Sequence, residues 1–267
     1  MQQPPAVSVV ANLNEHPERR TLNAEIHARP YVPITAPARV CQLAFLGGDA
    51  AGELAIITKL CGHYGVASPA PGTGFFVADM GPFQFRWERH TEFSTYRYTQ
   101  TGPVDHPFRP LAVESAPMEL VSAAPGQLMA AVAVAVKPAP DSWTAGRASL
   151  SVEGSDRYFA EGSTAGVEAS GGDAEIYSDF FVDAQGFTRF LVYDRGMRPR
   201  QTGRMVQRLV EIETYRAMAM LGFPPARAAG AEVTQFDHRL AEITARMSVE
   251  GDVEQDRALL TGLVQLA

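Results

Sequence analysis

The run 127–136 constrains the fold more than any other segment, because it is mostly aliphatic over the length of one strand. Such a run is typical of a strand in the centre of a sheet. Together with the segments 39–46, 49–65, 74–80, 83–99 and 108–124, it predicts the order strand, helix, strand, strand, helix, strand. This order is the split βαβ, or ferredoxin-like, pattern. We therefore expect an α+β fold with a ferredoxin-like N-terminal half.

The rest of the chain predicts three further parts. A helix over 14–29 precedes the first strand, and a linker over 138–145 follows the last. Short strand-like runs at 148–152, 174–182 and 187–193 then predict an antiparallel β-rich half, with a glycine turn at 183–186 and a closing helix over 202–221. The apolar residues Phe236, Leu240, Ile243 and Met247 indicate a helical extension. The expected units are 1–137, 138–225 and 226–267.

Composition excludes several classes of protein. A hydrophobic content of 46% with 20% charged residues is typical of a folded globular chain. The net charge of −7 argues against a general nucleic-acid binder. Cys41 and Cys61 stand far apart, which fits a reducing, cytoplasmic compartment and provides no zinc motif. Phosphate-loop, Gly-x-Ser-x-Gly and His-Glu-x-x-His motifs are absent from the sequence.

The segment 83–93 contains the first candidate site. Read as one strand, it puts Glu88, His90 and Glu92 on one face and the aromatic residues on the other. Imidazole and carboxylate groups are ordinary ligands of a divalent metal, and His27 at the end of the first helix could join them. The row could equally transfer protons, contact a ligand, or form an ordinary polar sheet face. His27 is equally explained by its favourable interaction with the helix dipole.

A second candidate site lies on the predicted helix 202–221. Arg204, Arg208 and Glu211 follow one face at four- and three-residue steps, and could hold an anion with help from Arg189. The alternative is a salt-bridged stripe on the helix surface. Asp179 stands in an aromatic strand and, if buried, should pair with Arg189. The ligand-binding candidates from both sites are His27, Arg29, Glu88, Arg89, His90, Glu92, Asp179, Arg189, Arg204, Arg208 and Glu211.

Four motifs in this order resemble an uncharacterised bacterial family, the domain of unknown function 3422. They are LNAEIHARP at 22–30, WERHTEF at 87–93, DAQGFTR at 183–189 and GRMVQRLVEIETYR at 203–216. The resemblance implies a cytoplasmic-type globular part, a long helical stretch and a C-terminal membrane helix. This sequence contains no membrane segment, so we expect the soluble part of a membrane-associated protein at the inner face of the membrane; the alternative is a natural short member of the family.

Two hypotheses about function follow. The first is a non-enzymatic ligand-binding or scaffold module that self-associates through its C-terminal helices, without nucleic acid. The second is a metal-dependent enzyme or sensor that uses His27, Glu88, His90 and Glu92 around a divalent metal. The ligand or substrate stays open in both.

Overall fold

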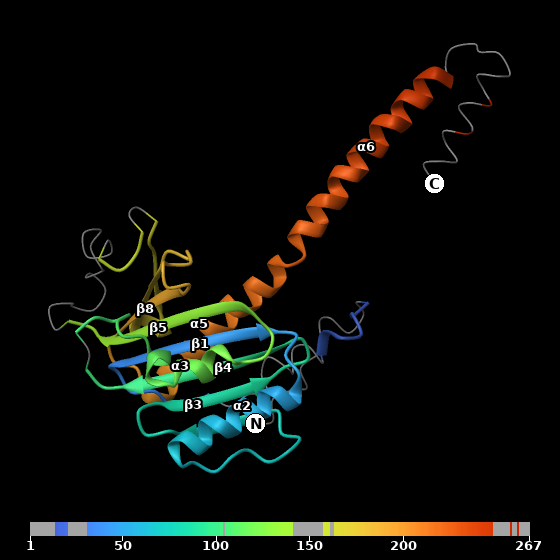
Figure 1. Ribbon diagram of the computed structural model, residues 1–267. Coiled ribbons are helices and arrows are strands. Elements are labelled where there is room, and N and C mark those ends of the chain that lie inside the picture. The colour runs from blue at the N-terminus through green and yellow to red at the C-terminus, as the bar shows by residue number, and fades with distance from the viewer. Residues whose placement is uncertain are drawn as a thin grey trace, which may run out of the picture.

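An eight-stranded mixed sheet forms the body of the protein, in the order β2-β3-β4-β1-β5-β8-β7-β6 (Figure 1). The computed structural model describes residues 14–20, 31–103, 105–140, 157–160 and 163–247, with Arg257 and Thr261. All neighbouring strands are antiparallel except β5 and β8, which are parallel. The α+β class is therefore confirmed.

The strands and helices follow one another along the chain with these bounds: β1 Ala38–Leu46, α2 Ala50–Tyr64, β2 Phe75–Asp79, β3 Gln84–Arg89, β4 Phe93–Thr101, η1 Ala112–Ser115, α3 Met118–Ser122, β5 Gln127–Pro138, β6 Ala165–Ala169, η2 Ser170–Gly172, β7 Ala174–Ser178, β8 Thr188–Asp194, α5 Pro199–Met220 and α6 Phe223–Met247.

Local sequence signals set several of these bounds. The Asp49 side chain accepts a hydrogen bond from the Gly52 N–H at 2.7 Å and so caps α2, as its position predicts. Gly65 ends the same helix in the left-handed region, with φ at 68°. Between β7 and β8, Asp183 accepts hydrogen bonds from two following backbone N–H groups, and Gly186 adopts a φ of 86°. The predicted turn at 183–186 is confirmed.

The central strand β5 divides the core into two layers. Its alanines at 131, 133 and 135 lie among the aromatic side chains on one face, which α2 covers with Ile57 and Leu60. Its valines at 132, 134 and 136 lie on the other face, against Val206 and Val210 of α5. Small residues leave room for the large rings, while the valines fill the gap to the helix. Each fully buried valine or leucine contributes about 1.5–3 kcal/mol to stability.

The ferredoxin-like pattern is not confirmed, because residues 83–99 form two strands and a tight turn where one strand was expected. Strands β2, β3 and β4 form an antiparallel meander, and β4 then pairs with β1. The expected helix over 108–124 is reduced to the short elements η1 and α3, since prolines at 110 and 117 interrupt it.

The two expected halves share one sheet, since β8 pairs with β5 from Val132↔Thr188 to Pro138↔Asp194. The domain boundaries at 137 and 225 stay predictions. Most of the expected N-terminal helix and the expected strand at 148–152 lie outside the described residues.

Helix α6 extends away from the sheet and from the other helices (Figure 1). From Phe223 to Ala245 every side chain on it is exposed apart from Ile243, which is half-buried. The expected helical extension is therefore present as far as Met247.

Candidate functional site

Strand β3 presents different chemistry to the two faces of the sheet. Its residues Arg86 and Glu88 are buried on the side of α5, where the Arg86 Nη2 lies 2.5 Å from the Glu88 Oε1. Trp87 and Arg89 point to the side of α2. The predicted alternation therefore holds from residue 84 to residue 89.

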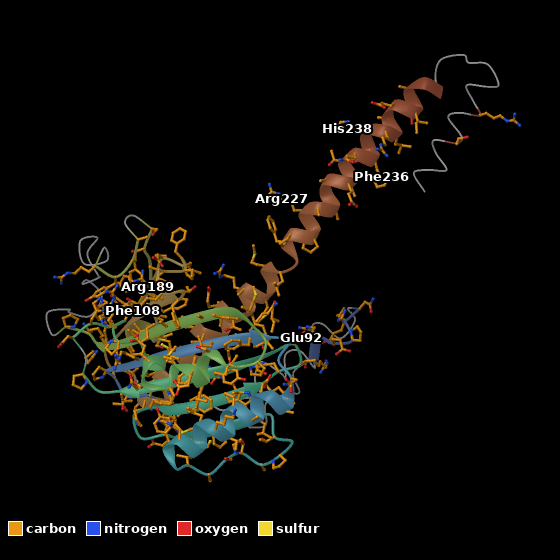
Figure 2. The ribbon with its side chains drawn as sticks, in the orientation of Figure 1. Glu92, Phe108, Arg189, Arg227, Phe236 and His238 are labelled. Atoms are coloured by element: carbon orange, nitrogen blue, oxygen red, sulfur yellow. The ribbon has the colours of Figure 1, made fainter. Side chains whose placement is uncertain are left out.

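The predicted row of Glu88, His90 and Glu92 is wrong at its last member. Strand β3 ends at Arg89, and the His90 N–H donates to the Phe93 carbonyl at 2.8 Å, which closes a tight turn. Glu92 lies in this turn and is exposed (Figure 2). Antiparallel pairing of β3 with β4 reverses the chain, so period-two geometry does not continue through residue 92.

A small pocket, with room for about one water molecule, lies between this hairpin, β1 and the C-terminal half of α5. It brings together the predicted candidates Glu88, His90 and Glu211 from separate elements. The His90 ring stacks on the Phe93 ring, with centroids 4.0 Å apart. The residues that line the pocket are Gln42, Glu88, His90, Phe93, Thr95, Arg97, Glu211, Thr214 and Tyr215.

Arg97 of β4 is the cation of this pocket, and the sequence reasoning missed it. Its Nε and Nη2 donate to the Gln42 Oε1 at 2.9 and 2.7 Å, and the Gln42 Nε2 donates to the Thr214 Oγ1 at 3.1 Å. Burial and the nearby Arg86 guanidinium lower the pKa of Arg97, and the carboxylates of Glu88 and Glu211 raise it by a smaller amount. The resulting pKa is about 10. Strand alternation alone puts Arg97 on the face opposite to Tyr96 and Tyr98, but it names no partner for it.

Glu211 faces the sheet from α5. Burial raises the pKa of its carboxyl, although the Gln207 Nε2 donates to its Oε1 at 2.7 Å and Arg97 attracts it. The protonated form of Glu211 is thereby favoured relative to an exposed glutamate. The pocket therefore brings together the Arg97 guanidinium, the Glu211 carboxyl and the Thr95 hydroxyl.

A buried carboxylate on the opposite face of the sheet also escaped prediction. Glu53, in the first turn of α2, is 1% exposed. It accepts hydrogen bonds from the Trp87 Nε1 at 3.2 Å, the Arg89 Nη1 at 2.8 Å and the Ser94 Oγ at 2.8 Å. This arrangement ties α2 to the β3–β4 hairpin, so the candidate Arg89 has a structural partner. The only signal in the sequence is an acidic residue in a first helical turn.

The candidates Asp179 and Arg189 form a separate cluster; the strand expected over 174–182 ends at Ser178, so Asp179 follows β7 and does not lie within it. Asp179 is buried, as expected, and its Oδ2 lies 3.8 Å from the Arg189 Nη2, which confirms the predicted pair. Asp183 lies 3.4 Å from the Arg189 Nε. The guanidinium also lies over the Phe108 ring, 5.7 Å from its centroid (Figure 2).

The predicted stripe on α5 is not joined by ion pairs among the described residues. Arg204 and Arg208 are exposed, and Arg204 lies over the Tyr31 ring at 4.9 Å. Glu211 turns toward the sheet instead, because the helix packs with this edge over β1 and β4. The three side chains therefore do not converge on one anion site.

The metal hypothesis gains no support from the described residues. His27 and Arg29 lie outside them, so their part in a site stays a prediction. Within the described ranges, no three His, Cys, Asp or Glu side chains are grouped closely enough to hold a metal ion.

The chain belongs to a family of proteins of unknown function, DUF3422, whose model matches residues 14–267. The resemblance expected from the four motifs is confirmed at the level of the family. No curated protein matches the chain, and no solved structure does. Among the described helices, none combines the length and the apolar character that crossing a bilayer requires.

Proposed function

We propose that this protein is a non-enzymatic scaffold module that assembles with a second copy of itself through α6. The observation that carries the proposal is the exposure of Val233, Phe236 and Leu240, which are 57%, 46% and 49% exposed on a helix that leaves the body of the protein (Figure 2). From the family resemblance, we place the module near the inner face of a bacterial membrane. Nothing in the described residues favours the metal-dependent alternative.

The apolar residues of α6 follow a heptad pattern over the whole helix. Steps of three and four residues lead along one seam, from Ala226 and Ala229 through Val233 and Phe236 to Leu240, Ile243 and Met247. A 25-residue helix is about 37 Å long. A single exposed helix of this kind is only marginally stable in water, and burying the seam against another helix stabilises it.

The sizes of the seam residues favour an antiparallel partner. If Val233 faces Phe236 of the second copy, then Ala226 faces Ile243 and Ala229 faces Leu240 of that copy. Small residues thus lie opposite large ones in successive layers, which fills the interface evenly. The pairing is symmetric, as in a two-fold dimer.

The charges beside the seam favour the same direction. In the antiparallel register Glu232 of each copy lies across from Arg239 of the other, so the dimer contains two opposite-charge pairs. A parallel, in-register dimer would instead place Glu232 across from Asp237, and like charges repel.

Analytical ultracentrifugation of the full chain tests the assembly. We expect a mass near twice 28.9 kDa, or about 58 kDa. Leu240→Glu should weaken the dimer by about 100-fold or more, because it buries a charge in the seam. The control His238→Glu changes the opposite side of α6 and should leave the dimer intact. The measurement is repeated over a 100-fold range of chain concentration. A wild-type chain that is a monomer even at the highest concentration would overturn the proposal.

A charge reversal tests the direction. Glu232→Arg should weaken an antiparallel dimer, because it places Arg opposite Arg239, and the double variant with Arg239→Glu should restore it. If Glu232→Arg alone tightens the dimer, the copies are parallel and the antiparallel register is wrong.

A further inference from the structure

We propose that the exposed face of α5 binds an acidic segment of a second copy of the chain, residues 250–256, through a stripe of arginines. The proposal rests on the antiparallel assembly through α6 proposed above. It adds a second contact to that assembly, in which the segment that follows α6 in one copy lies against the body of the other.

The basic stripe consists of Arg200, Arg204 and Arg208, which are all exposed and follow one another at steps of four residues on α5. The sequence contains no acidic residue between positions 195 and 210. Among the described residues none of the three arginines forms an ion pair, and Arg204 lies over the neutral ring of Tyr31. Like charges at this spacing repel one another, so an acidic partner stabilises the stripe.

The apolar seam of α6 continues onto α5 and leads to the basic stripe. Ile212, Ala219 and Ala226 follow one another at the seven-residue step of the seam, and Ile212 is 61% exposed. Helical hydrogen bonds cross the junction, because the Ala226 N–H donates to the Gly222 carbonyl at 3.1 Å and the Gly222 N–H to the Ala219 carbonyl at 3.3 Å. A partner that follows the seam past Gly222 therefore arrives at Arg208, one turn before Ile212.

The acidic segment cannot reach the basic stripe of its own chain. Residues 250–256 include four acidic side chains and no basic one. Asp256 is nine residues beyond Met247, and nine extended residues span at most about 32 Å. Helix α6 alone is about 37 Å long and leads away from the sheet (Figure 1). The segment therefore ends short of α5 in the same copy.

A second copy brings the acidic segment to the stripe. In the antiparallel register, Met247 of the second copy lies across from Gly222. The segment begins three residues and ends nine residues beyond that point, so it covers distances from about 5 Å, with a helical rise, to about 32 Å, with an extended one. Arg208 and Arg204 lie about 21 and 27 Å from Gly222 along the helix, within this reach. The contact occurs twice in a two-fold dimer.

Charge reversal tests this contact by sedimentation of the full chain at low ionic strength. The stripe variant contains Arg204→Glu and Arg208→Glu, and the segment variant replaces the four acidic residues of 250–256 by lysine. Each should weaken the dimer about tenfold, because exposed ion pairs are weak singly but are formed at both ends of the dimer. The two sets combined should restore the affinity to within about threefold of the wild type.

A matched control makes the same change in charge elsewhere. Lys59→Glu with Arg109→Glu alters exposed positions on α2 and in the loop before η1, and should leave the dimer intact. Near-ultraviolet circular dichroism shows which variants are folded.

A chemical crosslink locates the contact. The chain has only two lysines, so Arg208→Lys adds an amine that a water-soluble carbodiimide joins to a carboxylate in contact with it. We expect a covalent dimer whose linked peptides contain position 208 of one copy and residues 250–256 of the other. Arg109→Lys is the control and should give no such peptide.

The outcomes separate this contact from the assembly itself. A wild-type chain that is a monomer at the highest concentration would overturn both. A wild-type dimer that the folded stripe variant does not weaken would overturn the contact alone, as would a combined variant that regains no affinity or the absence of the crosslink. If the stripe variant dimerises normally but loses binding to phosphatidylglycerol vesicles that the wild type binds, the stripe serves an anionic lipid surface and the contact is wrong.

Discussion

The buried carboxylate of Glu53 should be among the most sensitive positions for stability, because one side chain joins three segments of the chain. It accepts hydrogen bonds from Trp87, Arg89 and Ser94, the last at 2.8 Å from each of its two oxygens. Replacement by alanine removes the acceptor and leaves these donors in place.

The magnitude follows from the burial of each donor. Trp87 and Ser94 are 1% and 3% exposed, so water cannot easily replace the carboxylate, and each unsatisfied donor costs about 1–3 kcal/mol. The Arg89 side chain is 32% exposed and can turn toward solvent, so its contribution is smaller. We expect Glu53→Ala to lower the free energy of unfolding by about 3–5 kcal/mol, the usual result of removing one partner of a buried pair.

Urea denaturation followed by tryptophan fluorescence measures this effect. With a slope of about 3 kcal/mol per molar urea, a loss of about 4 kcal/mol lowers the midpoint by about 1.3 M. Glu53→Gln keeps the volume and one acceptor oxygen, so it should lie between the wild type and the alanine variant. Glu119→Ala, at an exposed position in the first turn of α3, serves as the matched control and should change the free energy by less than about 0.5 kcal/mol. If both alanine variants have the same midpoint, the reasoning about Glu53 is refuted.

Three further outcomes are expected. Gly203→Ala should destabilise the protein by about 1–3 kcal/mol in the same urea assay, because its Cβ would lie 2.0 Å from the Val32 carbonyl oxygen. The control Gly230→Ala meets no atom within 4 Å and should add up to about 1 kcal/mol of stability. Equal effects of the two substitutions would contradict the close approach at Gly203. Asp179→Asn should lower the free energy of unfolding by about 2 kcal/mol, and an unchanged thermal midpoint would show that its pair with Arg189 contributes little. Burial raises the pKa of the Cys41 thiol to about 11, so Ellman's reagent at pH 8 should leave it unmodified in the folded chain and modify it in urea; rapid reaction of the folded chain would show that the thiol is accessible.

Part of the candidate site follows from the sequence, and part does not. The alternation in 84–89 correctly separates Glu88 from Trp87, and Asp179 was correctly paired with Arg189 across a short turn. Glu88, His90 and Glu211 were all named as candidates, but no pattern linked the first two to the third. Arg97 and Gln42 were not named, since an arginine in a strand has no local signature of burial.

The sequence by itself determines the local features of this protein: the cap at Asp49, the glycine turn at 186, the aliphatic strand β5 and the apolar seam of α6. Each depends on residues within a few positions of one another, so periodicity and turn chemistry are sufficient. Only the tertiary structure decides which strands pair and which side chains meet. Gln42 reaches Thr214 across 172 residues and Arg97 across 55, and the chain turns after Arg89 because β3 finds its partner in β4. Pairing of distant segments depends on the energy of the whole packed core, which no local window of sequence contains.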